Sequence, residues 1–100
     1  MSAYATAAAW FDVYAIAEKW DQGSCSFGVD FLDKFSAILT VLESFPRLYG
    51  RVKRAPRGRE IRCARIGNTM YLAVYEVRDD HARVFSVYHA HQKYAWRRRL

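Results

Sequence analysis

The sequence has few cysteines and no long hydrophobic run, and these absences exclude several classes of protein. Its two cysteines, Cys25 and Cys63, lack the spacing of a disulfide framework or a zinc site, which predicts two reduced thiols. No apolar run approaches the length that spans a bilayer, so a transmembrane helix is excluded. The N-terminus lacks the basic start of a signal peptide, and acidic residues soon follow it. We therefore predict a cytoplasmic protein.

Histidine is also scarce. Of the three histidines, His89 and His91 would share one face of a strand. Two imidazoles without a carboxylate or thiolate beside them make a poor metal site. The sequence therefore predicts no metal centre and no cofactor.

Acidic residues become rare after the first half of the chain. Residues 1–46 carry six acids and two bases, whereas residues 47–65 carry eight bases and one acid, and residues 66–100 six bases and three acids. Seven of the eight central bases are arginines, whose planar fork suits phosphate and carboxylate groups. This distribution favours a basic surface that binds nucleic acid or an acidic protein, over a merely solvated face.

The first 46 residues predict a helical hairpin. Residues 2–21 place Trp10, Val13, Tyr14, Ala17 and Trp20 at helical spacing, and residues 21–24 interrupt the pattern. A second amphipathic helix follows, and Pro46 ends it. Its apolar stripe consists of Phe27, Phe31, Phe35, Ile38, Leu42 and Phe45.

Residues 47–91 predict an antiparallel sheet. A short edge strand at 51–55 would precede a hairpin whose arginine-studded strand and apolar strand (70–77) meet at a Gly67-Asn68 turn. Because residues 70–77 are apolar on both faces, we place this strand inside the sheet. A strand at 83–89 follows. The expected fold is a single α+β domain, with the helical hairpin packed on a three- to four-stranded antiparallel sheet. The basic tail at 92–100 would be a short helix or an extended arm, and we expect its end to be mobile.

Several local phrases, in this order, resemble the RelE/ParE family of toxins from bacterial type II toxin–antitoxin modules. They are LESFP at 42–46, RGREIR at 57–62, YLAVYEV at 71–77, DD at 79–80 and VFSVYH at 84–89. Family members usually open with a β-strand before the first helix, whereas helix-like residues begin here almost at Met1. We therefore expect either that the chain lacks that strand or that the true start of the protein lies upstream.

The resemblance implies one of two toxic activities. RelE-type members cleave mRNA at the ribosome with basic residues on the sheet, whereas ParE-type members inhibit DNA gyrase. Arg65 matches a basic position of the RelE-type pattern, but Cys63, Leu72 and Ala90 replace other basic residues. Trp96 falls near the position where RelE-type members carry a catalytic tyrosine, and an indole cannot transfer a proton as a phenol does. This comparison favours a ParE-like, non-enzymatic toxin that inhibits growth through gyrase and is neutralised by a cognate antitoxin.

Two alternatives stay open. The first is a RelE-type mRNA endoribonuclease acting on the ribosome, with Arg65 and His89 as candidate catalytic residues. The second is a degenerate, non-toxic member that only binds an antitoxin or RNA. By strand alternation Arg59 and Arg65 point one way and Arg62 the other. The predicted target-binding residues are Arg59, Arg62, Arg65, His89, Trp96, Arg97 and Arg98. The predicted antitoxin-binding residues are Tyr71, Tyr75 and Tyr88, and alone the chain would be a monomer or a dimer.

Overall fold

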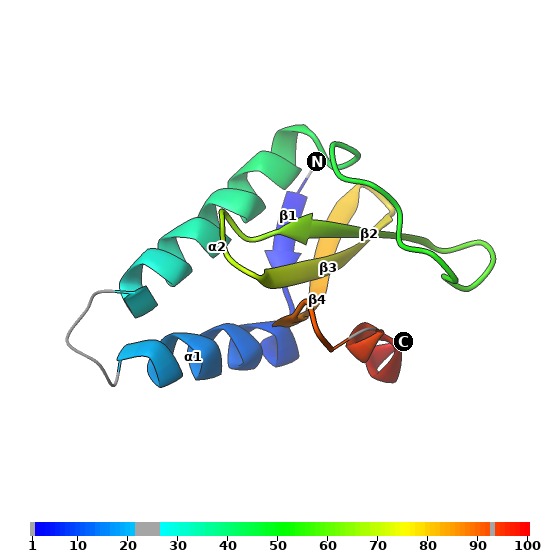
Figure 1. Cartoon of the computed structure of the whole chain (residues 1–100). Coiled ribbons are helices and arrows are strands. Elements are labelled where there is room, and N and C mark those ends of the chain that lie inside the picture. The colour runs from blue at the N-terminus through cyan, green and yellow to red at the C-terminus, as the bar shows by residue number, and fades with distance from the viewer. Residues whose placement is uncertain (1, 22–26, 93) are drawn as a thin grey trace.

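The computed structural model describes residues 2–21, 27–92 and 94–100, which form two α-helices and one four-stranded sheet. The strands lie in the order β1-β4-β3-β2. Figure 1 shows the C-terminal turn beside the first residues of α1, with α2 on the other side of the sheet's end. The predicted α+β class is confirmed. The elements are β1 (Ser2–Ala5), α1 (Ala7–Asp21), α2 (Phe27–Ser44), β2 (Glu60–Arg65), β3 (Tyr71–Arg78), β4 (His81–His89) and the 3-10 helix η1 (Ala95–Arg99).

The chain does have a strand before its first helix, so the predicted absence of that strand was wrong. Residues Ser2–Ala5 form β1, which pairs in parallel with the first half of β4 and makes the sheet mixed rather than antiparallel. Thr6 fixes where the helix begins, because its Oγ1 accepts a hydrogen bond from the Ala9 N–H at 3.1 Å. Alanine favours a helix, but intrinsic propensity is a weak influence, and pairing with β4 overrides it here.

The helices pack on one face of the sheet largely as their spacing predicts. Val13 of α1 and Phe31, Phe35 and Leu42 of α2 are fully buried against that face. Tyr14, which the spacing placed on the core side, is instead 57% exposed. Other predicted features, namely the break after α1, the side chains of Trp20 and Phe27, and Cys25, lie outside the described part of the chain. Phe45 follows the last residue of α2 and is also exposed.

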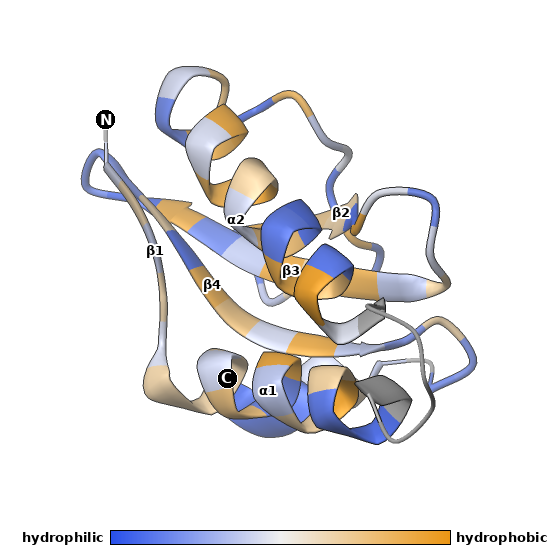
Figure 2. Cartoon of the chain, turned by 90° about the vertical axis from the view of Figure 1, so that its left-hand side faces the viewer, coloured by the Kyte–Doolittle hydropathy of each residue, from blue (hydrophilic) through white to orange (hydrophobic). Residues whose placement is uncertain are grey.

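The opposite face of the sheet, which we call the open face, carries a second small core. Ile61, Val74, Phe85, Tyr88 and Trp96 form this cluster, and residues of the 50–55 loop and η1 pack around it. The strand β3 lies between β2 and β4, as its two apolar faces predict. Figure 2 shows hydrophobic stretches along both β3 and β4.

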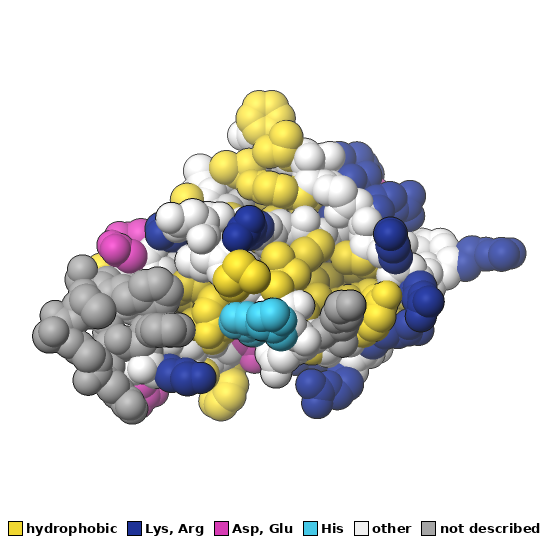
Figure 3. All heavy atoms as spheres, viewed as in Figure 1, with side chains coloured by type: hydrophobic (Ala, Val, Ile, Leu, Met, Phe, Trp, Pro, Cys, Tyr) yellow, Lys and Arg dark blue, Asp and Glu magenta, His cyan; other side chains and the backbone are white. Residues whose placement is uncertain are grey.

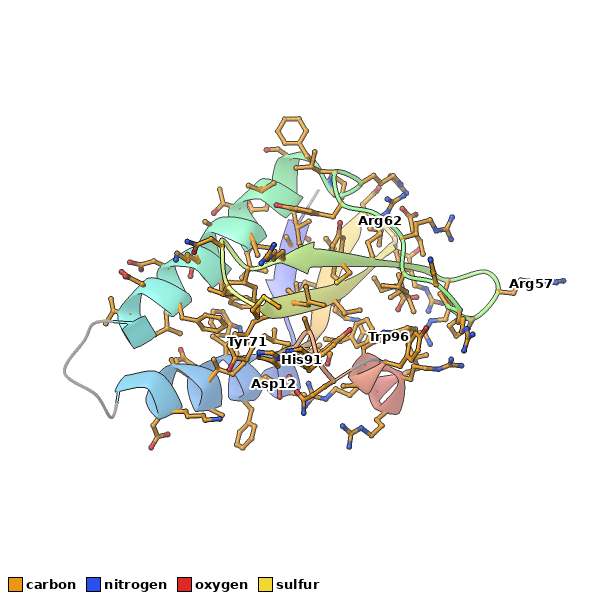
Figure 4. The ribbon with its side chains drawn as sticks, in the orientation of Figure 1. Asp12, Arg57, Arg62, Tyr71, His91 and Trp96 are labelled. Carbon is orange, nitrogen blue, oxygen red and sulfur yellow. The ribbon has the colours of Figure 1, made fainter. Side chains whose placement is uncertain are left out.

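Two expectations about the irregular segments were wrong. Residues 51–55 do not form a strand, and only a single bridge joins Arg51 to Arg62. The tail is not a mobile arm over its described residues, because η1 folds back and buries Trp96 to 2% exposure in the open-face core. An indole of this size contributes much apolar area, so its burial holds the tail in place. Figure 4 shows Trp96 between η1 and the sheet.

Side chains replace a strand along the outer edge of β4. After β1 ends at Ala5, the Asp12 carboxylate accepts a hydrogen bond from the Val87 N–H at 3.0 Å. The guanidinium of Arg99 donates to the Phe85 carbonyl at 3.1 Å and forms an ion pair with Asp12. These contacts satisfy backbone groups that would otherwise be open to pairing with another chain. Asp12 of α1 and Arg99 of η1 thus meet across the sheet edge. No helix in the described residues combines the length and hydropathy needed to cross a bilayer.

Candidate target-binding surface

A shallow groove lies on the open face between the 50–55 loop and the C-terminal turn. Its volume is about 300 Å³, and its floor is mostly apolar. Leu72 and Tyr88 reach it from β3 and β4, because they lie opposite each other in the sheet register. The lining residues are Val52, Lys53, Leu72, Tyr88, Ala90, Tyr94 and Trp96.

Basic side chains surround this groove. Arg54 lies over the Tyr94 ring at 5.8 Å, and Arg97 over the Trp96 ring at 5.9 Å. Arg57 projects from the tip of the loop, as Figure 4 shows. None of these three has a carboxylate within ion-pair distance among the described residues. Figure 3 shows Lys and Arg side chains along this edge of the molecule, beside a hydrophobic area. We call Lys53, Arg54, Arg57 and Arg97 the basic rim. Arg98, in the same turn as Arg97, lines a separate hollow with Asp12 and Ser86.

The arginines around β2 are, in contrast, engaged inside the protein. Arg59 forms a two-pronged ion pair with Glu76, with N–O distances of 2.9 and 2.8 Å. Arg62 contacts Glu60 at 2.8 Å and donates to the Tyr49 carbonyl at 2.6 Å. Because these guanidinium groups already have partners, they offer less to an external target than the basic rim does.

The environment of Glu60 shows how the arginines hold this edge. Burial by itself would raise the pKa of Glu60, but hydrogen bonds and charges from Arg47 and Arg62 outweigh it and lower the pKa. The carboxylate therefore stays ionised between its two arginines. This cluster ties the loop after α2 to the start of β2.

The two candidate catalytic residues do not come together. Arg65 leaves β2 on the side of Leu72, whereas His89 leaves β4 on the side of Tyr71, which belongs to the helix-covered core. The strand β3 lies between them, so their backbones are about 10 Å apart or more. Arg65 donates to the Thr69 carbonyl at 2.7 Å. His89 stacks on His91 with ring centroids 4.7 Å apart.

The three tyrosines predicted to bind an antitoxin are buried in this structure. Tyr75 is fully buried, and its hydroxyl donates to the Pro46 carbonyl at 2.8 Å. Tyr71 and Tyr88 are each 9% exposed. Trp96, predicted to bind the target, is a core residue as well. Arg97 and Arg98 of the same turn are exposed.

Cys63, Leu72 and Ala90 stand where a RelE-type nuclease would hold phosphate with basic side chains, and none of them is charged at neutral pH. Burial raises the pKa of the Cys63 thiol to about 11, so the thiol stays protonated at neutral pH. Burial, and to a lesser degree the neighbouring Cys63, raise the pKa of Tyr88 to about 12. Leu72 and Ala90 supply only apolar surface. Among the described residues no group of three or more metal-binding side chains is close enough to hold an ion.

Sequence reasoning missed the groove because it assigned its wall to a strand. Lys53 and Arg54 are consecutive, so a strand would have turned one of them toward the core, and this conflict was a usable signal. Tyr94 has a positive φ of 62° before η1, which no sequence pattern indicated. No family model matches this chain, and a search of curated proteins finds no significant match.

Proposed function

We propose that this protein is the toxin of a bacterial type II toxin–antitoxin module, of the ParE-like kind that acts on DNA gyrase. The observation that carries the proposal is β1. The one expected departure from the RelE/ParE order of elements was a missing first strand, and the chain has that strand, paired with β4. The order strand, helix, helix and three strands, together with the local phrases, supports this family.

The open-face groove favours a protein target over RNA cleavage. Its floor is apolar where a nuclease needs phosphate-binding bases, and its described lining residues include no paired acid and base. An apolar groove with unpaired cations around it suits a protein surface that carries acidic groups next to an apolar anchor. In our proposal the basic rim and this groove contact the target.

Charge reversal of the rim tests this proposal. Expression of the chain in a bacterial host should stop growth, and the triple variant Lys53→Glu, Arg54→Glu, Arg57→Glu should relieve the arrest. Repulsion by acidic groups of the target should lower the association rate by roughly tenfold or more. The matched control is Arg78→Glu, whose side chain is 75% exposed on the hairpin between β3 and β4. Thermal melts of both variants should stay close to that of the parent.

Assays with purified protein and in the bacterial host then distinguish the alternatives. Inhibition of gyrase supercoiling by the parent, and not by the triple variant, is the expected result. Discrete codon-linked cuts in mRNA, seen by primer extension after induction, would contradict the proposal and favour the RelE-type reading. Absence of growth arrest, with RNA binding that falls steeply as salt rises, would favour the non-toxic reading.

For the antitoxin, the outer edge of β2 is the best docking surface. The 50–52 segment covers part of this edge, with the Val52 N–H bonded to Ile61 O at 2.9 Å and the Cys63 N–H to Gly50 O at 3.1 Å. Past Cys63 the edge continues beside a groove of about 430 Å³ against α2. An extended segment that adds to the strand and places apolar side chains in a groove is a common recognition mode. The groove is lined by Lys34, Ala37, Ile38, Val41, Tyr49, Arg65 and Gly67.

A substitution in this groove should separate antitoxin binding from toxicity. Val41→Glu adds a charge on the apolar wall and should weaken pull-down of the adjacent gene's product by roughly thirtyfold or more. Growth arrest should persist, because Val41 lies far from the basic rim in the fold. The control for a charge change is Glu43→Lys, at an exposed position of the same helix. Equal co-purification of the Val41 variant and the parent would contradict the assigned surface.

A further inference from the structure

The outer face of α1 is apolar, which is unusual for a helix at the surface. Ala7, Phe11, Tyr14 and Glu18 follow one another at steps of four, three and four residues, and all are exposed. Phe11 is 74% exposed and Tyr14 57%. Surface helices normally place polar residues on this side, since their apolar stripe already faces the core. The exposed aromatic pair therefore indicates a face that another molecule covers.

We propose that the covering molecule is a second copy of this chain, bound antiparallel through α1 about a two-fold axis. This inference is independent of the proposed function. Steps of four and three alternate in the seven-residue repeat that lets two helices pack along a seam, and the four positions here span more than one such repeat. With the axis level with Asp12 and Val13, Phe11 meets the partner's Tyr14, and Ala7 meets the partner's Glu18. The seam is thus complementary to itself, as a two-fold contact requires.

Small and preoriented side chains beside the seam favour close contact. Ala8 and Ala15 flank the seam and are exposed, so a second helix can approach without steric conflict. Tyr14 is held by a stacked contact with Trp10, with ring centroids 5.6 Å apart and an interplanar angle of 27°. An aromatic ring that is already ordered loses less entropy when it binds.

Charges select the antiparallel arrangement. The first turn of α1 contains no acidic residue, so the positive end of the helix dipole is uncompensated. Glu18 makes no ion pair within the described residues. An antiparallel pair places each Glu18 beside the first turn of the partner's helix, twice in one dimer. A parallel pair would instead bring the two positive ends together.

The expected size of the contact indicates a weak dimer. Phe11 and Tyr14 each expose on the order of 100 Å², and the two copies bring four such rings together. With the alanines and the edge of Trp10, the buried area reaches roughly 1,000 Å². This value is at the lower end for specific interfaces, so a dissociation constant in roughly the micromolar range is expected.

Sedimentation of the purified full chain over a range of concentrations tests the dimer. The parent should pass from monomer to dimer, and Phe11→Glu should raise the dissociation constant by roughly thirtyfold or more. Phe45→Glu is the matched control, because Phe45 is 63% exposed at the far end of α2, and it should dimerise like the parent. Circular dichroism melts show that each variant folds. A parent that stays monomeric, or equal loss in both variants, would overturn the proposal.

Cross-linking then tests the register. In a Cys25→Ser background, Ala7→Cys and Glu18→Cys should form a disulfide with each other when the two variants are mixed and oxidised. Neither variant should cross-link well with itself, because the axis separates identical positions. Stronger self-cross-linking of Ala7→Cys would indicate a parallel pair and would contradict the antiparallel dimer.

Discussion

Replacement of Trp96 by alanine should cost about 3–5 kcal/mol of the free energy of unfolding. The indole is 2% exposed and packs in the open-face core with Phe85 and Tyr88. Its loss would leave a cavity on that face and would release η1 from the sheet. A domain of this size has a total stability of about 5–15 kcal/mol, so the variant should melt on the order of 15 °C lower. Urea denaturation followed by circular dichroism measures the change.

The neighbouring Arg97→Ala is the control for this prediction. Arg97 is exposed, and its side chain approaches the Trp96 ring at 5.9 Å, a weak contact, so its truncation should cost less than about 1 kcal/mol. A Trp96 variant that is as stable as Arg97→Ala would show that the tail is not part of the core. A mobile tail that binds the target, as the sequence predicted, would on deletion weaken target binding more than folding. The structure now predicts the opposite for Trp96, and leaves a target-binding role to Arg97 and Arg98.

After Trp96→Ala, we expect Glu76→Gln to cause the largest loss in the free energy of unfolding among the substitutions proposed. The Glu76 side chain is 4% exposed and joins Arg59, at 2.8 Å, to Arg83, at 3.4 Å. Removing its charge leaves two arginines beside each other without compensation. Breaking a fully buried pair costs about 3–5 kcal/mol, but Arg59 and Arg83 are 28% and 36% exposed, so we expect about 2–3 kcal/mol. The control Asp79→Asn removes an equal charge from an 86% exposed side chain and should be nearly neutral.

The effect of Glu76 should disappear in acid. The hydrogen bond from Arg59 is the largest influence that lowers the pKa of Glu76, and it outweighs the opposing effect of burial, with help from Arg83. A carboxyl with a lowered pKa in the folded state stabilises the fold above its unfolded pKa, near 4.5, and loses that contribution as the pH falls through the folded pKa. The stability difference between the parent and Glu76→Gln should therefore be constant near pH 7 and shrink below about pH 4.5. A difference that is the same at pH 7 and pH 3 would exclude the ion pair as its source.

Regular periodicity made most of the fold predictable. The stripe through Phe31, Phe35 and Leu42 located α2, and the Gly67-Asn68 turn located the hairpin of β2 and β3. The strand β1 was not predictable, because its alanines favour a helix and its pairing partner lies about eighty residues away along the chain. Long-range pairing of this kind leaves no local signal. The prediction followed helix propensity, whereas the structure followed the pairing of residues 2–5 with the otherwise free edge of β4.

The candidate site was harder to predict than the fold. Arg59 and Arg62 follow the strand pattern that marks a binding surface, but their carboxylate partners lie elsewhere in the sequence, so their internal use was hidden. Trp96 combines a basic neighbourhood with a large apolar ring, and only the packing shows which property decides its place. The groove beside Lys53 depends on the path of an irregular loop, for which residue patterns give little information.

The pairing of β1 with β4 has a consequence for synthesis of the protein. Residues 2–5 leave the ribosome well before their partners, His81–Val84, which are made about eighty residues later. The contact of Asp12 with Arg99 forms later still. During translation the helices and the β2–β3 hairpin have their neighbours available early, whereas β1 waits beside an incomplete sheet. Contacts of high sequence separation form most slowly, and here they are the contacts that cover the outer edge of β4. A nascent chain therefore exposes that edge until η1 has left the ribosome.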